Sequence, residues 1–94
     1  MNYLRQIVGF YSTLEVKPLS ARSQALWHCL MWHYNSARWR SPIVVSESVL
    51  CGELGLSHKQ FLTARKELVE GGYIIHNHQQ GRKPASYEIL SLEE

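Results

Sequence analysis

The sequence predicts a mainly α-helical domain that carries a small β-hairpin near its C-terminal end. Apolar residues recur at three- and four-residue steps along much of residues 3–68, as they do on one face of a helix. Two short strand-like runs, separated by a loop rich in Gly and basic residues, close the chain. The 94 residues are enough for one domain, here residues 1–94, and 45% hydrophobic content is typical of a folded globular protein.

Two helices are expected before the first break in the pattern. The first covers residues 1–16, with a clear apolar stripe from Asn2, and it ends at Lys17 because the residue before Pro18 avoids the helical region. Ser20 is a suitable N-cap for the second helix, over residues 20–37. That helix is apolar around most of its circumference, with Trp32 among its apolar residues, and is therefore expected at the centre of the core.

The next segment has the pattern of a helix-turn-helix over residues 46–70. A β-type run at residues 43–45 precedes a short helix that Ser46 caps and Gly55 ends. Ser57 and Gln60 have the spacing of a capping box at the start of another helix, which runs to about Glu70. Within that helix the expected core face consists of Phe61, Ala64 and Leu68.

A β-hairpin is expected over residues 73–92. Its strands are predicted at residues 73–78 and 85–92, with a loop at residues 79–84 between them. A hairpin directly after the second helix of a helix-turn-helix is the arrangement of a winged helix. The predicted fold is therefore a winged helix-turn-helix with an extra N-terminal helix.

Four segments of the chain carry a more specific resemblance. Together they resemble the N-terminal winged-helix domain of DnaD-like primosomal and phage or mobile-element replication initiators. The segments are YLRQIVGFY, PLSARSQALWHCLMWHYN, VLCGELGLSHKQFLTARKELVEGGYI and SYEIL, and the aromatic ALWHCLM run is the most specific part. The resemblance implies a role in replication initiation, with oligomerisation through this domain and DNA binding shared with a separate C-terminal domain. It leaves open whether the chain is a fragment of a longer protein.

The overall charge is weak for a nucleic-acid binder, so the placement of the charges matters. Net charge is +2, and the pI of about 8.7 lies below the guide value of about 9. Residues 57–87, however, hold five Lys or Arg against two Glu. If the second helix of the motif enters the major groove of DNA, the expected contacts are His58, Lys59, Gln60, Thr63, Arg65, Lys66, Arg82 and Lys83.

These contacts have distinct expected roles. The cations neutralise phosphates, Gln60 pairs with adenine, and Thr63 meets a thymine methyl group or a phosphate. The alternative is an ordinary solvated helix face. Leu62, predicted on the same face, is better explained by a surface for a protein partner or by packing under a neighbouring element. Arg38, Trp39 and Arg40 form a second basic and aromatic cluster, for which capping of the core is expected more than nucleic-acid contact.

The N-terminal helix is expected to contribute to self-association. A free helix of this length is marginal in water and must pack against something. Its own domain is one candidate, and the same helix of a second chain, giving a homodimer or higher homo-oligomer, is the other. The expected interface residues are Tyr3, Leu4, Ile7, Val8, Tyr11 and Leu14.

Catalytic chemistry is not expected, and neither is a metal or other cofactor. Cys29 and Cys51 are interpreted as buried thiols. Cys29 and His33, one helical turn apart, are interpreted as core residues rather than as a nucleophile and its base. His76 and His78 alternate on a predicted strand but lack a third metal ligand at a suitable spacing.

These observations predict a cytoplasmic domain that binds double-stranded DNA, because neither a signal peptide nor a membrane span is indicated. The predicted context is a replication-initiation protein, with other replication proteins as possible partners. Two alternatives stay open, namely a protein-interaction module without DNA binding of its own and a winged-helix transcription regulator.

Overall fold

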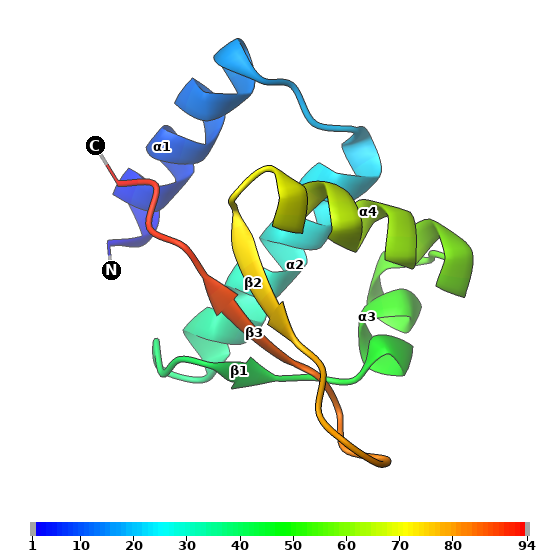
Figure 1. Cartoon of the computed structure of the whole chain (residues 1–94). Coiled ribbons are helices and arrows are strands. Elements are labelled where there is room, and N and C mark those ends of the chain that lie inside the picture. The colour runs from blue at the N-terminus through cyan, green and yellow to red at the C-terminus, as the bar shows by residue number, and fades with distance from the viewer. Residues whose placement is uncertain (1, 94) are drawn as a thin grey trace.

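Four helices and a three-stranded antiparallel sheet are present in residues 2–93, the part of the chain that this computed structural model describes. Met1 and Glu94, the ends of the predicted domain, lie outside the described residues. Figure 1 shows α2 running behind the sheet, with α1 on one side and α3 and α4 on the other. In chain order the elements are α1 (Tyr3–Val16), α2 (Ala21–Ser36), β1 (Ile43–Val44), α3 (Glu47–Leu54), α4 (His58–Glu70), β2 (Ile74–Asn77) and β3 (Ser86–Ile89).

The helices begin where the sequence supplies a side-chain cap. Ser20, Ser46 and Ser57 each accept a hydrogen bond from the backbone N–H three residues further along. Gln60 completes the predicted capping box at the start of α4. Gly55 ends α3 with a φ of 68°, in the left-handed region that glycine adopts without steric strain. The helix-turn-helix is therefore set by local signals.

The sheet has the order β1-β3-β2, and Tyr87 lies in its central strand opposite Ile43 and His76. Both hairpin strands are shorter than predicted. The structure ends β2 at Asn77 and β3 at Ile89. After β3, the Leu90 N–H still donates to the Tyr73 carbonyl, whereas the Leu90 carbonyl and the Leu92 N–H bond to a side chain of α1.

The core is built around α2, as predicted. Leu26, Trp27 and Leu30 are fully buried, and the Trp27 ring stacks on Phe10 of α1 with centroids 3.9 Å apart. Trp32 lies on the same apolar helix, but its side chain is mostly exposed. None of the helices in the described part of the chain is long and apolar enough to cross a membrane.

The last described residues hold α1 against the domain. Gln6 is fully buried, its Nε2 donates to the Leu90 carbonyl at 2.8 Å, and its Oε1 accepts from the Leu92 N–H at 2.7 Å. At Gly9 an added Cβ would lie 1.6 Å from the Leu92 carbonyl oxygen, so only glycine allows this close approach. We call the contact among Gln6, Gly9, Leu90 and Leu92 the terminal clasp. Figure 1 shows both chain ends beside α1.

Candidate nucleic-acid interface

Helix α4 has the two faces that the sequence predicts. Its inner face is buried and consists of Phe61, Ala64 and Leu68. Its outer face is exposed to solvent and includes Lys59, Thr63 and Lys66. Leu62 is half-buried and packs against the core, which agrees with the second of the two explanations expected for it. The exposed leucine expected of a protein-partner surface is therefore absent from this face.

A cleft of about 280 Å³ separates the outer face of α4 from the start of α2. Lys59 lines it from α4, and Arg22 lines it from the first turn of α2. The Ser20 N–H donates to Glu67 Oε1 at 2.7 Å and holds the two helices together across the cleft. Arg22 was missed at the sequence level because only the packing of α2 on α4 brings this arginine beside Lys59.

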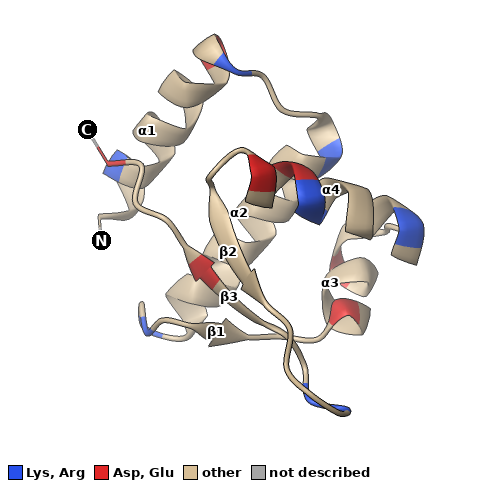
Figure 2. Cartoon of the chain, viewed as in Figure 1, with Lys and Arg blue, Asp and Glu red and all other residues tan. Residues whose placement is uncertain are grey.

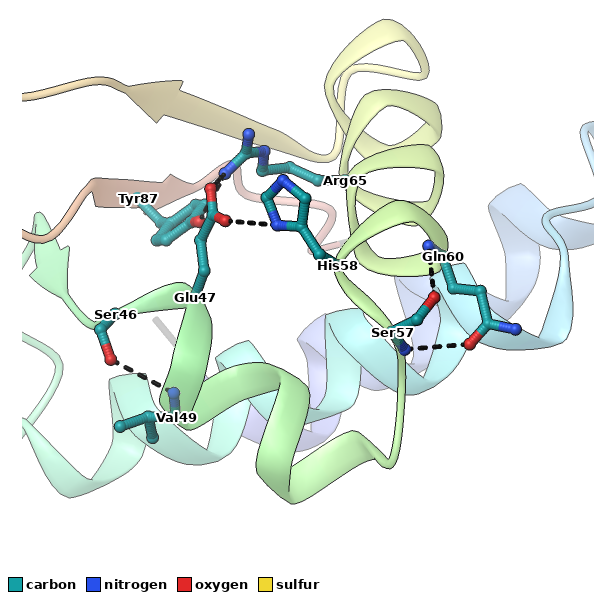
Figure 3. Close-up of polar contacts among 8 residues, drawn as sticks. All are labelled: Ser46, Glu47, Val49, Ser57, His58, Gln60, Arg65 and Tyr87. Atoms are coloured by element: carbon teal, nitrogen blue, oxygen red, sulfur yellow. Dashed lines mark hydrogen bonds and ion pairs between the residues drawn. The ribbon is translucent and has the colours of Figure 1, made fainter.

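Arg65 does not take the role that the sequence predicts. Its side chain is only 14% exposed, and its guanidinium donates to Glu47 Oε1 at 2.9 Å and to the Tyr87 hydroxyl oxygen at 3.2 Å. These bonds tie α4 to α3 and to β3 (Figure 3). Burial raises the pKa of Tyr87, which keeps its hydroxyl protonated. Because the guanidinium is engaged within the fold, Arg65 has a structural role and is not available for a phosphate.

His58 and Gln60 also have partners inside the protein. His58 is exposed, and its Nδ1 lies 3.1 Å from the second carboxylate oxygen of Glu47 (Figure 3). The Gln60 side-chain oxygen accepts from the Ser57 N–H at 3.0 Å. A bidentate pair with adenine needs both the side-chain oxygen, to accept from the adenine N6–H, and the amide nitrogen, to donate to N7. The predicted adenine contact would therefore compete with the helix cap.

Thr63 and Lys66 remain accessible. The Thr63 hydroxyl donates to the Lys59 carbonyl at 3.1 Å, which leaves its methyl group and oxygen lone pairs exposed. Lys66 Nζ lies 3.9 Å from a carboxylate oxygen of Glu70, and both side chains are well exposed. Exposed pairs of this kind contribute little and open easily. Both residues can therefore still contact a ligand.

The wing adds positive charge away from the helices. Arg82 and Lys83 are exposed in the loop between β2 and β3, next to the turn at Gly81. Figure 2 shows positive charge at the tip of this loop and at the N-terminal end of α4, whereas acidic residues gather at the C-terminal end of α4. The positions predicted for DNA contact thus form two separate basic areas, one at α4 with Arg22 and one at the wing.

The second basic and aromatic cluster caps the core. Trp39 is half-buried and packs edge-on against Tyr3 and Tyr34, with centroids 5.9 and 5.1 Å apart. Its ring is therefore not free to stack on a base. Arg38 and Arg40 beside it are exposed.

The predicted oligomer interface is divided between two surfaces. Tyr3, Ile7 and Leu14 are half-buried and pack against the core of their own domain. The other residues are exposed on one side of α1, and we call them the outer stripe: Leu4 (74% exposed), Val8 (56%) and Tyr11 (49%).

The two cysteines and His33 are less buried than predicted. Cys29 and Cys51 are free thiols and are both half-buried. His33 is half-buried too, and together with Cys29 it faces Glu53 of α3. His76 stacks on Tyr87, and burial lowers its pKa, whereas His78 is exposed and lies beyond the end of β2.

Comparison with known proteins adds information on the fold. No protein-family model matches the sequence, and no curated protein is significantly similar to it. A solved structure described as "Structure of Rep-DNA complex" superposes with a TM-score of 0.71, covering 88% of this chain and 70% of that chain. This chain is a winged helix. The sequence identity of 18% means that the likeness concerns the fold.

Proposed function

We propose that this winged helix is a double-stranded-DNA-binding domain of a replication-initiation protein, and that it binds rather than catalyses. The observation that carries the proposal is the placement of exposed cations, with Lys59 and Arg22 at one cleft and Arg82 and Lys83 at the wing. The fold likeness to a chain in a Rep–DNA complex supports the replication context. A place among the DnaD-like initiators is supported by the sequence resemblance alone.

In the proposed complex the outer face of α4 lies in the major groove. Lys59 and Arg22 contact phosphates on either side of the cleft, and Thr63 is the residue of this face best placed to meet a base edge. Arg82 and Lys83 contact the neighbouring backbone or minor groove. With Lys66, five cations are available, so the logarithm of affinity should fall with the logarithm of salt concentration with a slope of up to about −4.5.

The proposal is tested by fluorescence-anisotropy titration of duplex and single-stranded DNA across a salt series. The double variant Arg22→Ala/Lys59→Ala should lose about 10- to 100-fold in duplex affinity. It should also reduce the salt slope by about two, one for each phosphate contact. The matched control is Arg38→Ala/Arg40→Ala, which removes the same charge from an exposed loop outside the proposed interface. Equal losses in the two double variants would contradict the proposed face.

We further propose that the domain forms a homodimer through the outer stripe. Its side chains follow an i, i+4, i+7 spacing and leave a large apolar area exposed on α1. A two-fold dimer would present two DNA-binding faces to paired half-sites. Light scattering should therefore give a dimeric mass that Leu4→Asp/Val8→Asp halves and that Val16→Asp, at the end of the same helix, leaves unchanged.

Two other functions are distinguished by different measurements, the first by the same titrations and the second by the DNA sequences that the domain selects. A protein-interaction module of an initiator would form oligomers without binding duplex DNA at low salt. A transcription regulator would bind DNA as proposed and select operator sequences instead of an origin. The weak overall charge favours the first, whereas the cations on both sides of the cleft favour DNA binding.

A further inference from the structure

Three different metal-binding side chains meet on the side of α2 that faces α3. Cys29 and His33 lie one turn apart on α2, and Glu53 comes from the last turn of α3. Their ligand atoms, one from each residue, all lie within 4.8 Å of one another. Glu53 Oε1 is 2.5 Å from His33 Nε2 and 3.6 Å from Cys29 Sγ. We propose that these residues form a zinc-class divalent metal site, independent of the proposed DNA interface.

The donor set and its spacing suit such an ion. Thiolate, imidazole and carboxylate are the three protein ligands of Zn²⁺, at about 2.3, 2.0–2.1 and 2.0–2.2 Å. Ligand atoms at the corners of such a tetrahedron are about 3.3–3.7 Å apart, which the Cys29–Glu53 separation already matches. The closer His33–Glu53 contact opens by rotation of the Glu53 side chain, which is 41% exposed.

The hydrogen bonds of the cluster also suit a cation. Glu53 Oε1 accepts from the Cys29 thiol and contacts His33 Nε2, so one carboxylate oxygen already meets both other ligands. When a divalent ion binds, the Cys29 S–H bond breaks, its proton goes to solvent, and the thiolate binds the metal.

The site is accessible, and its position has a structural consequence. The side chain of His33 is 19% exposed, so an ion can enter from solvent. Three protein ligands leave a fourth coordination position for water. Because Glu53 belongs to α3, a bound ion would fasten the first helix of the helix-turn-helix to the core helix α2.

The test is titration of Co²⁺ into the chelator-treated full chain, followed in the near-ultraviolet and visible spectrum. One equivalent should produce thiolate-to-cobalt charge-transfer absorption and the strong visible bands of a tetrahedral ion, and Zn²⁺ should remove both. Cys29→Ser should abolish the charge-transfer band, whereas the matched control Cys51→Ser should retain it. Glu53→Gln should weaken Co²⁺ binding by at least about tenfold.

Thermal unfolding provides a second measurement. Zn²⁺ should raise the Tm of the wild type and of Cys51→Ser, and should leave that of Cys29→Ser unchanged. The proposal is overturned if no thiolate band appears at one equivalent, or if Cys29→Ser keeps the band. It is also overturned if Cys51→Ser loses the band while remaining folded by circular dichroism. If Cys29→Ser fails to fold, Glu53→Gln decides alone, and unchanged Co²⁺ affinity in that variant rejects the site.

Discussion

The terminal clasp and the outer face of α4 use polar side chains in opposite ways. In the clasp, Gln6 is fully buried and its amide has a partner at both ends. On α4, Lys59 is exposed and lines an open cleft. A buried amide must be satisfied and therefore accepts one geometry, whereas a hydrated cation is available to a ligand at little cost to the fold. Polar groups thus determine the structure in the terminal clasp, whereas those on the outer face of α4 remain accessible to solvent.

The largest effect is expected at Gly9 in the clasp. Gly9→Ala places a methyl group against a backbone carbonyl that cannot move without displacing residues 90–92. We expect about 3 kcal/mol of destabilisation in chemical denaturation. Gly52→Ala is the matched control. An added Cβ at this exposed position of α3 contacts nothing, so the substitution should raise the unfolding free energy by up to about 1 kcal/mol. Equal results for the two variants would show that the close approach at Gly9 does not constrain the fold.

The next largest effect is expected at Gln6. Gln6→Leu replaces the amide with an apolar side chain of similar size. The Leu90 carbonyl and the Leu92 N–H then lose their partner. The expected cost is about 2–3 kcal/mol, because unpaired buried polar groups retain their desolvation penalty. Gln80→Leu, at an exposed wing position, should change the unfolding free energy by less than about 0.5 kcal/mol. Hydrogen exchange should show increased opening of α1 in the first variant only.

Arg65 and Lys66 are neighbouring cations on α4, and they allow a polar group that stabilises the fold to be compared with one that is exposed to solvent. Arg65→Met removes the bonds to Glu47 and Tyr87 and should destabilise by about 1–2 kcal/mol. Lys66→Met should leave stability nearly unchanged and should reduce the salt slope of DNA binding by about one. The opposite pattern, with Lys66 stabilising the fold and Arg65 setting the salt slope, would contradict the assignment of their roles.

The smallest effect on folding stability is expected from protonation of His76 at acidic pH. Burial is the main cause that lowers the pKa of His76, with the positive charge of Arg65 second. As pH falls below about 6.5, His76 is therefore protonated in the unfolded chain while it is still neutral in the folded chain. The stability contributed by neutral His76 is complete above pH 6.5 and is lost as pH falls through the lowered pKa. His76→Gln should flatten this part of the stability–pH curve, which urea unfolding at a series of pH values measures.

Local signals made most of the fold predictable. Ser46, Ser57 and Gly55 act within three or four residues, so the sequence alone places the helix-turn-helix correctly. The clasp could not be predicted in this way. Gln6 lies in a helical pattern like any other polar residue, and its burial depends on partners 84 and 86 residues further along the chain.

The candidate site was only partly predictable for the same reason. Lys59, Thr63, Arg82 and Lys83 are exposed because helix periodicity and a loop already determine their positions. Arg65 lies on the same helix as Lys59, but its side chain hydrogen-bonds to Glu47 of α3 and Tyr87 of β3 and is therefore largely buried. Arg22 and Glu53 acquire their neighbours only when α2 packs on α4 and α3.

The position of the chain ends beside α1 has a mechanical consequence. A force that pulls the two termini apart acts first on the terminal clasp, because residues 2–9 and 90–93 lie directly between the points of attachment. The sheet and the helix-turn-helix come under tension only after α1 and residues 90–92 have separated. The terminal clasp would therefore open first under force, while the helix-turn-helix stays folded.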